Sequence, residues 1–278
     1  MLLRKIFTLL IFISSALSYG EELKIISLSP NLTEIIFLLK KESNLAGRSS
    51  VCCYPQDTLK IPIAGNLGDP DLEKVISIKP DAIFLTMVKD MSKIRILKNL
   101  GIKVHIFQSN NISQYLETVR TLGEILNAKE VAKQEIERVK SKIFELESAN
   151  LAIRNNKKPK VFWVVWDNPI ITAGKNSFID EYICLAGGEN IMGEIKKSYF
   201  YTSKENIISA KPDIIIAPNM KASKIKELET AIGWKKLPAV KNKRVYGSLD
   251  LNLVYILGPR MFDAISVIHK CLYSEPTS

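Results

Sequence analysis

The chain has 278 residues, of which 46% are hydrophobic and 24% are charged. This length and composition suffice for two compact domains with buried cores, and they exclude a chain that is disordered throughout. The formal net charge is +10, but the lysines are spread along helical segments without interleaved aromatic residues, so nucleic-acid binding is not indicated.

The first predicted element is an export signal. Arg4 and Lys5 precede an apolar run from Ile6 to Ile13, and small residues follow. This order is typical of a secretory signal peptide, which we assign to residues 1–20, and the run is shorter than the roughly 20 residues that a membrane span needs. Because no cysteine lies near the cleavage site, a lipid anchor is not expected. The sequence predicts a free periplasmic protein, with an uncleaved anchor helix as the alternative.

Two series of alternating strands and helices follow. In residues 21–127, the segments KIISLS, DAIFLT and KVHIF have the composition of strands, and helical stretches separate them. In residues 157–278, KVFWVVW, IITAG, DIIIAP and RVYGS form a second series. Such alternation favours parallel sheets flanked by helices. We therefore expect an α/β protein of two lobes, each with a central, mostly parallel sheet.

Residues 128–156 predict one long helix between the lobes. This stretch contains neither Pro nor Gly and repeats apolar residues at helical spacing, and a helix of this length spans on the order of 35 Å. Pro159 halts any continuation. Because a flexible Gly/Ser hinge is missing, we expect the lobes to move little relative to one another.

A thirteen-residue segment occurs twice. LEKVISIKPDAIF at residues 72–84 aligns without gaps with KENIISAKPDIII at residues 204–216, and seven of the thirteen residues are identical. Each copy predicts a helix that packs through Ile76 or Ile208, ends before a proline and leads through an aspartate into a buried strand. We infer that the lobes are related by a pseudo-two-fold axis.

Glu73 and Glu205 occupy equivalent positions in the two copies. Each could stabilise its own helix: Glu205 by completing a capping box with Thr202, and Glu73 by lying at the positive end of a helix that begins at Asp69 and Pro70. Two symmetric carboxylates would also offer equal anchors to a partner that bears arginines. Both interpretations stay open, because a capping glutamate can also dock.

No enzyme signature occurs in the sequence. It contains no G-x-x-x-x-G-K, no G-x-G-x-x-G after a strand, no G-x-S-x-G and no H-E-x-x-H. The two histidines, His105 and His269, lie far apart, so neither a His-based triad nor a His-rich metal site is indicated. We expect no catalytic residues, no resident metal and no cofactor; an exported chelatase-like enzyme is the less favoured alternative.

Four cysteines in an exported chain raise the question of disulfides. Cys184 and Cys271 are single, and a bridge between them would close a long loop and stabilise the fold by about 4 kcal/mol in the chain-entropy model. Cys52 and Cys53 are adjacent. They could be free thiols near a ligand, a strained vicinal disulfide or a soft metal donor, and two small buried residues without a role are the plain alternative.

Six segments carry a resemblance to a known family. They are KIISLSPNLTEIIFLL, GRSSVCCYPQDTLKIPIAGN, DLEKVISIKPDAI, ITAGKNSFIDEYICLAGGENI, SKENIISAKPDIII and GPRMFDAI. Together they resemble the periplasmic cobalamin-binding proteins of ABC importers, over nearly all of the chain after the leader. In this family, which includes ferric-siderophore and haem binders, a long helix bridges two α/β lobes and the ligand lies in the cleft between them.

The resemblance implies roles for individual residues. It implies that Glu73 and Glu205 dock on arginines of the permease subunits, and that Cys184 and Cys271 form a disulfide. It also implies a ligand site in the cleft with residues from both lobes: Ser29, Pro30, Asn31, Cys53, Tyr54, Asn66, Tyr199, Tyr201, Asp250 and Tyr255. At position 199 tyrosine replaces a tryptophan of the family and keeps a stacking face with a polar tip.

Two loops depart from the family pattern, and these departures bear on the identity of the ligand. The loop AGNLGDPD lacks the aromatic residue that precedes the docking glutamate in the family, and the loop SLDLNLVYILGPR differs in length. We expect a monomer that binds a small metal chelate, a cobalt corrinoid, and delivers it to the transmembrane subunits of an ABC importer. A ferric siderophore or haem is the alternative ligand, because Arg260 with Tyr199 and Tyr255 could hold an anionic chelate.

Overall fold

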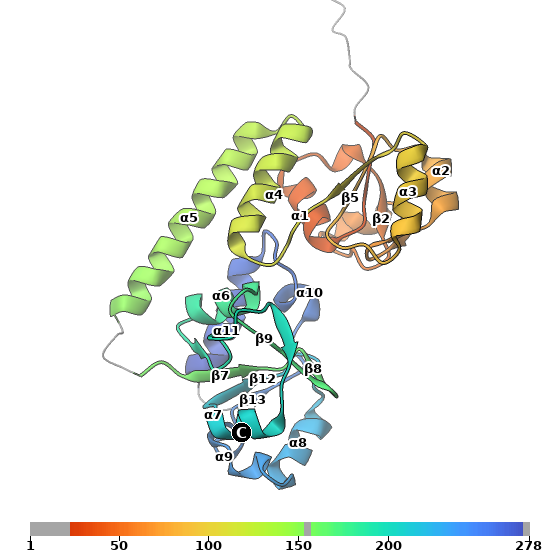
Figure 1. Cartoon of the computed structure of the whole chain (residues 1–278). Coiled ribbons are helices and arrows are strands. Elements are labelled where there is room, and N and C mark those ends of the chain that lie inside the picture. The colour runs from red at the N-terminus through yellow and green to blue at the C-terminus, as the bar shows by residue number, and fades with distance from the viewer. Residues whose placement is uncertain (1–22, 153–156, 275–278) are drawn as a thin grey trace, which may run out of the picture.

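The computed structural model describes residues 23–152 and 157–274, so the leader assigned to residues 1–20 lies outside the described residues. Two α/β lobes are joined along one side by the helix α5 (Lys129–Ala152), as Figure 1 shows. This arrangement confirms the predicted fold class. Within the described ranges, no helix combines the length and the apolar composition that crossing a membrane requires.

The N-terminal lobe is built on a six-stranded sheet with the order β4-β3-β2-β1-β5-β6. Its strands are β1 (Ile25–Ser27), β2 (Leu45–Ser49), β3 (Ile63–Asn66), β4 (Asp69–Pro70), β5 (Ala82–Leu85) and β6 (Lys103–Ile106). All neighbours pair in parallel except β3 and β4. Helices cover both faces, as the nearly continuous apolar runs of β1 and β5 require.

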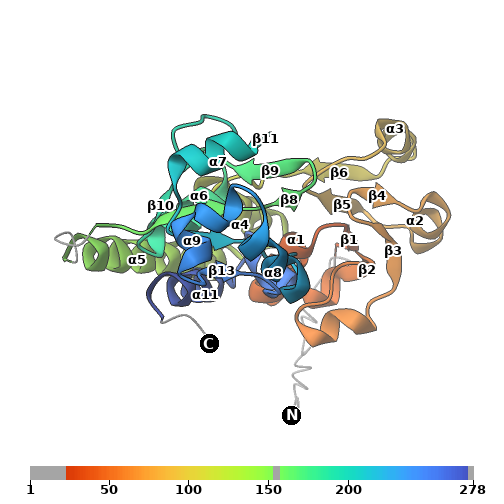
Figure 2. The same ribbon diagram turned by 90° about the horizontal axis from the view of Figure 1, so that it is seen from below.

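Each face of this sheet packs on its own pair of helices. On one face, Ile25 and Phe84 meet α1 (Pro30–Leu38) and α4 (Ile112–Ile125). On the other, Ile26 and Ile83 meet α2 (Leu72–Ile78) and α3 (Met91–Asn99). Two single-turn helices, η1 (Glu42–Asn44) and η2 (Gln56–Lys60), complete the lobe. Figure 2 shows this sheet to the right, apart from the C-terminal lobe and α5.

The C-terminal lobe contains two sheets. The parallel one has the order β10-β7-β12-β13, with β7 (Lys160–Trp163), β10 (Glu189–Asn190), β12 (Ile214–Ile216) and β13 (Val245–Tyr246). The antiparallel one, β11-β9-β8, consists of β8 (Trp166–Asp167), β9 (Ile170–Ala173) and β11 (Tyr199–Tyr201). The segment IITAG, predicted in series with the parallel strands, is thus a hairpin strand of the second sheet.

The helices of this lobe also form two layers. One face of the parallel sheet packs on α6 (Phe178–Leu185) and α11 (Met261–Tyr273). The other packs on α7 (Lys204–Ala210), α8 (Ala222–Thr230), η3 (Trp234–Lys236) and α9 (Pro238–Lys241). A short helix, α10 (Leu251–Val254), precedes α11.

The repeated segment forms the same unit in both lobes, because an aspartate after each helix joins two strands. Asp81 accepts the N–H of Lys24 at 2.7 Å and donates its own N–H to the Lys24 carbonyl at 2.8 Å. Asp213 does the same with Lys160 at 2.9 and 2.8 Å. Each aspartate thereby fixes the start of the central strand, β1 or β7, to the start of its neighbour.

Two details of the repeat were predicted wrongly. Asp71 and Ser203 are the N-caps, and each side chain accepts a backbone N–H three residues on. The capping box of Thr202 with Glu205 is therefore wrong, as is a start of α2 at Asp69, which pairs in β4.

The main buried residue of each repeated helix is the one before the predicted residue. Val75 and Ile207 are fully buried, whereas Ile76 is 48% exposed and Ile208 is half-buried and packs at the margin of the core. Adjacent helical residues point about 100° apart, and the packing of each helix on its sheet decides which of the two faces the core.

The predicted disulfide is absent. All four cysteines lie within the described ranges and all are free thiols. Although α6 and α11 pack together, Cys271 faces the core, whereas the exposed Cys184 lines a surface pocket beside Asn150 of α5. Burial of one thiol in the core and exposure of the other at the surface explain why the two sulfurs do not pair, since a disulfide requires the two Cβ atoms to lie about 3.8 Å apart.

Helix α5 is fixed to both lobes. Near its start, the buried Glu135 accepts the hydroxyl of Tyr115 from α4 at 2.8 Å and pairs with Arg138. Near its end, Asn150 donates to the carbonyls of Cys184 and Leu185. One continuous cluster of buried apolar residues runs from the N-terminal lobe through α5 into the C-terminal lobe.

Candidate ligand-binding site

A cavity of about 570 Å³ lies between the two lobes. Its N-terminal wall comes from the segments that follow β1, β2, β3, β5 and β6, and its C-terminal wall from the start of α6 and from residues 251–257. The lining residues are Pro30, Asn31, Val51, Leu67, Thr86, Met87, Ile106, Phe107, Gln108, Ser109, Asn110, Phe178, Leu251, Asn252, Tyr255, Ile256 and Leu257. Ligands of parallel sheets bind at such carboxyl ends of strands.

The cavity wall is apolar with interspersed amides and hydroxyls. Among the described residues that line it there is no Asp, Glu, Lys, Arg or His. Tyr255 donates its hydroxyl to the carbonyl of Val164, and burial raises its pKa to about 12, so its phenol is neutral near pH 7. The wall therefore suits an uncharged ligand with hydrogen-bonding groups at its rim.

The first cavity loop is fixed by hydrogen bonds behind its surface. Pro30 occupies the first turn of α1, where its missing N–H costs nothing. Ser29 is buried and accepts the N–H of Thr86 at 2.9 Å, which ties the loop after β1 to the loop after β5. Asn31 donates its amide to the hydroxyl of Ser109 at 3.1 Å. These bonds join three loops into one wall.

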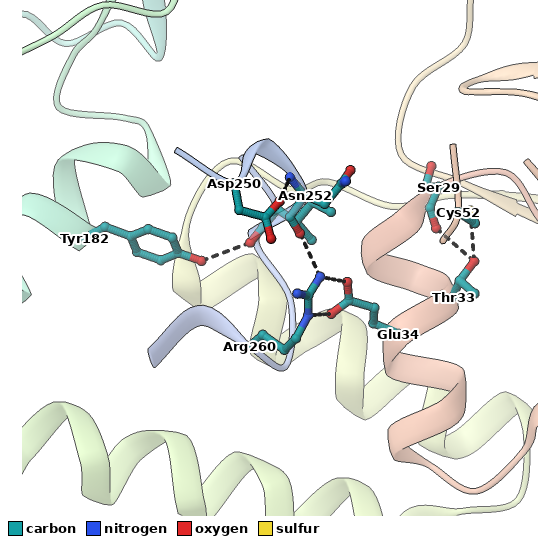
Figure 3. Close-up of polar contacts among 9 residues, drawn as sticks. Ser29, Thr33, Glu34, Cys52, Tyr182, Asp250, Asn252 and Arg260 are labelled. Atoms are coloured by element: carbon teal, nitrogen blue, oxygen red, sulfur yellow. Dashed lines mark hydrogen bonds and ion pairs between the residues drawn. The ribbon is translucent and has the colours of Figure 1, made fainter. Parts of the chain in front are cut away.

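The loop after β2 is held by a buried arginine. Arg48, 6% exposed, donates to three backbone carbonyls of the segment that it encloses, each at 3.0 Å. The thiol of Cys52 is buried and accepts the hydroxyl of Thr33 at 3.2 Å, as Figure 3 shows. Burial raises the pKa of Cys52, which keeps the thiol protonated. The neighbouring Cys53 is exposed and lies outside the cavity wall.

An arginine links the lobes beside the cavity. Arg260, the residue before α11, binds both carboxylate oxygens of Glu34 from α1, at 3.0 and 2.6 Å. The same guanidinium donates to the carbonyl of Asn252 at 2.7 Å (Figure 3). It also lies 3.8 Å from the ring centre of Tyr54. Burial raises the pKa of Glu34 against the opposing effect of Arg260, and the pair with Glu34 raises the pKa of Arg260.

Three of the residues predicted to bind ligand, Pro30, Asn31 and Tyr255, line the cavity. Ser29 supports the wall from behind, and Tyr54 stacks on the interlobe arginine. The remaining residues lie outside the wall: Cys53, Asn66, Tyr199, Tyr201 and Asp250. For these, a ligand contact stays a prediction.

Of the predicted residues outside the wall, two have hydrogen-bond partners elsewhere and two lie on an exposed edge strand. Asn66 accepts the hydroxyl of Ser50 at 2.6 Å, and Asp250 caps α10 by accepting the N–H of Asn252 at 2.9 Å. Tyr199 and Tyr201 lie on the edge strand β11, with 41% and 72% exposure.

Sequence reasoning missed most of the N-terminal wall. Thr86, Met87 and residues 106–110 directly follow or end segments that were predicted as strands. The rule that ligands bind at the carboxyl ends of parallel strands would have identified them. It also missed Glu34, for which the signal was a carboxylate within the apolar stretch around α1.

The two repeated glutamates lie in different lobes. Glu73 and Glu205 each take the second position of their helix, and both are exposed. Hydrogen bonds from its own N–H and from Ser203 lower the pKa of Glu205. Neither glutamate has an ion-pair partner among the residues that the structure describes.

A comparison with protein families decides the class. A family model described as periplasmic binding protein matches residues 25–248. The chain belongs to this family. The periplasmic binding protein fold explains the two lobes and places the candidate solute site in the interlobe cavity. The predicted family resemblance is thereby confirmed, and the family consists of solute-binding proteins of ABC transporters.

Curated relatives and a solved structure agree with this assignment. This periplasmic binding protein is 28% identical over 260 residues to the uncharacterized ABC transporter substrate-binding lipoprotein YvrC of Bacillus subtilis, covering 92% of this chain and 81% of that one. It is 27% identical over 219 residues to the vitamin B12-binding protein of Salmonella choleraesuis, covering 78% and 80%. A possible iron-binding periplasmic solute-binding protein of Staphylococcus epidermidis superimposes with a TM-score of 0.80 and 28% identity, covering 91% and 99%.

Proposed function

We propose that this periplasmic binding protein binds a cobalt corrinoid in the interlobe cavity and delivers it to the permease of an ABC importer. The observation that carries the proposal is the chemistry of the wall, which is apolar, rich in amides and free of charged side chains among the described lining residues. A corrinoid is a flat apolar macrocycle with carboxamide groups around its rim. The vitamin B12-binding relative supports the same assignment.

The apolar part of the wall matches the faces of such a ring. Both lobes contribute to it, through Val51, Leu67, Met87, Ile106, Leu251, Ile256 and Leu257. Burial of this surface against the macrocycle supplies most of the affinity, at about 25 cal/mol per Å² of apolar area removed from water.

The polar part of the wall matches the rim. Four residues with carboxamide side chains line the cavity: Asn31, Gln108, Asn110 and Asn252. Each can donate to and accept from a ligand carboxamide, and each such bond contributes about 1 kcal/mol net. Orientation of the ring is thus set by amide pairs, without a charged anchor.

The alternative ligands, a ferric siderophore or haem, fit this wall less well. Haem carries propionates and a ferric catecholate is anionic, and burying such groups without a cation is costly. Both arginines beside the cavity loops are engaged: Arg48 donates to three backbone carbonyls, and Arg260 is bound to Glu34 with 18% of its side chain exposed. The iron-binding structural relative keeps these ligands as the second candidate.

Calorimetry tests the proposal. Protein lacking residues 1–20 should bind cyanocobalamin and cobinamide with one ligand per chain. Haem and an anionic ferric catecholate should bind about 100-fold more weakly or not at all, because their charges meet no counter-ion. An absence of heat with either corrinoid, together with tight binding of an iron chelate, would reject the cobalt assignment.

A further inference from the structure

We propose that Arg260 is a positioning residue that sets the spacing between the two walls of the cavity. The inference concerns interlobe geometry, and it rests on the proposed function only for the choice of ligand in one of its tests. Arg260 itself does not line the cavity. Its contacts reach three segments that do.

The guanidinium is anchored in the C-terminal lobe. It donates to the carbonyl of Asn252, whose side chain faces the cavity. The segment that contains Asn252 is held to the rest of its lobe by two tyrosines. Tyr182 donates to the carbonyl of Ile256 at 3.2 Å, and Tyr255 donates to the carbonyl of Val164 at 3.3 Å. Arg260 and the C-terminal wall therefore move as one body.

From this anchor, Arg260 holds two elements of the N-terminal lobe. The bidentate bond to Glu34 fixes α1, and Asn31, one helical turn earlier, faces the cavity. The stacking on Tyr54 fixes the loop after β2, in which Val51 faces the cavity. One planar group thus sets the position of two N-terminal wall segments relative to the C-terminal wall.

The chemistry of the site requires an arginine. The side chain of Glu34 is 2% exposed, so its carboxylate depends on a buried partner. A guanidinium can bind both carboxylate oxygens, donate to a carbonyl and stack on a ring at the same time, whereas a lysine ammonium has no planar fork. An arginine can therefore hold all three segments at once.

A purely structural role is the competing explanation, and a double variant separates the two. Arg260→Met leaves the Glu34 carboxylate buried and unpaired, so stability falls under either explanation. In Glu34→Met/Arg260→Met both charges are gone, and stability returns because a buried pair can be replaced by apolar groups of similar size. The spacing does not return, since the contacts to Asn252 and Tyr54 are still missing.

The first test measures the spacing without any ligand. Spin labels on Lys98→Cys of α3 and Lys226→Cys of α8, with Cys53 and Cys184 replaced by serine, report the interlobe distance by electron double resonance. We expect one narrow distribution with Arg260 present and a broader or shifted one with Arg260→Met, alone or in the double variant. Identical distributions would overturn the proposal, whatever the ligand of the protein is.

The second test measures affinity for cyanocobalamin by calorimetry, well below the unfolding temperature of each variant. If one tenth of the molecules keep the productive spacing, the apparent affinity falls about tenfold. We expect this loss in both the single and the double variant. Recovery of affinity together with stability in the double variant would assign Arg260 a structural role only.

Arg244→Met is the control. It also removes a partly buried arginine, but one that donates to the carbonyls of Cys271 and Leu272 within the C-terminal lobe and does not line the cavity wall. We expect a loss of stability with unchanged affinity, and an equal loss of affinity would contradict the special place of Arg260. If the parent protein binds no corrinoid, the proposed function fails while the distance measurement still decides this inference.

Discussion

Amide side chains dominate the polar part of the cavity wall, and they lead to a prediction about single residues. Asn31→Ala and Asn252→Ala should each weaken corrinoid binding by about 2- to 12-fold, the equivalent of one hydrogen bond. The carbonyl of Asn252 that binds Arg260 is kept in this variant. Asn99→Ala, on the exposed side of α3, is the control. Unchanged affinity in both cavity variants would exclude recognition through these two amides.

His105 on β6 leads to a prediction about pH. Its ring lies 5.4 Å from Phe84 and 6.3 Å from Phe107, and burial, with a smaller effect of Lys103, lowers its pKa from 6.5. The folded protein thus binds the proton less readily than the unfolded chain. His105 therefore contributes stability that is present above pH 6.5 and is lost as the pH falls through its lowered pKa.

A titration followed by NMR checks this directly, because the chain has two histidines. The histidine resonance that remains in His269→Gln should titrate below pH 6.5. The unfolding free energy of the parent should fall between pH 7 and pH 5, and that of His105→Phe should fall less. A titration at or above 6.5 would mean that the ring is solvated.

At the level of single residues, the sequence could predict those wall residues that a motif contains. Asn31 lies in a segment whose resemblance to the family is visible in the letters, whereas Tyr255 lies in the loop SLDLNLVYILGPR, which departs from the family pattern. The pair of Glu34 with Arg260 joins positions 226 residues apart, and its partners are set by how two lobes pack. The disulfide prediction was wrong for the same reason. Whether Cys184 faces the core or the surface depends on how α6 packs against α5.

Among the elements, α2 and α7 carry the prediction about the permease. If the exposed Glu73 and Glu205 dock on two permease subunits, Glu73→Ala with Glu205→Ala should abolish corrinoid uptake by cells and leave calorimetric affinity unchanged, because neither residue lines the cavity. Glu147→Ala, an exposed glutamate near the end of α5, is the control for uptake. A parallel loss of uptake and of affinity would count against a docking role.

The repeat shows which features of an element the sequence encodes. The letters K-P-D occur in both copies, and both copies form a helix end, a proline and an aspartate that clamps two strands. The start and the buried face of each helix were less predictable. Several polar residues near each start could act as the cap, and the buried face depends on how the helix packs on its sheet, where Val75 and Ile207 meet the core.

For the whole molecule, the structure favours lobes that keep their relative position. Helix α5 is bonded to both lobes, and one apolar cluster continues through it. We expect the radius of gyration from small-angle X-ray scattering to change by less than about 1 Å on addition of a saturating corrinoid, as in other pre-organised binding proteins. A clear contraction would instead indicate a hinge.

The central claim is that the interlobe cavity holds a cobalt corrinoid. Crystals grown with cyanocobalamin and measured at the cobalt absorption edge test it most directly, because the anomalous signal locates the metal without a model of the ligand. We expect one strong peak per chain between the loop of Asn31 and the segment of Tyr255. A peak at the protein surface, or no peak from crystals soaked to saturation, would contradict it.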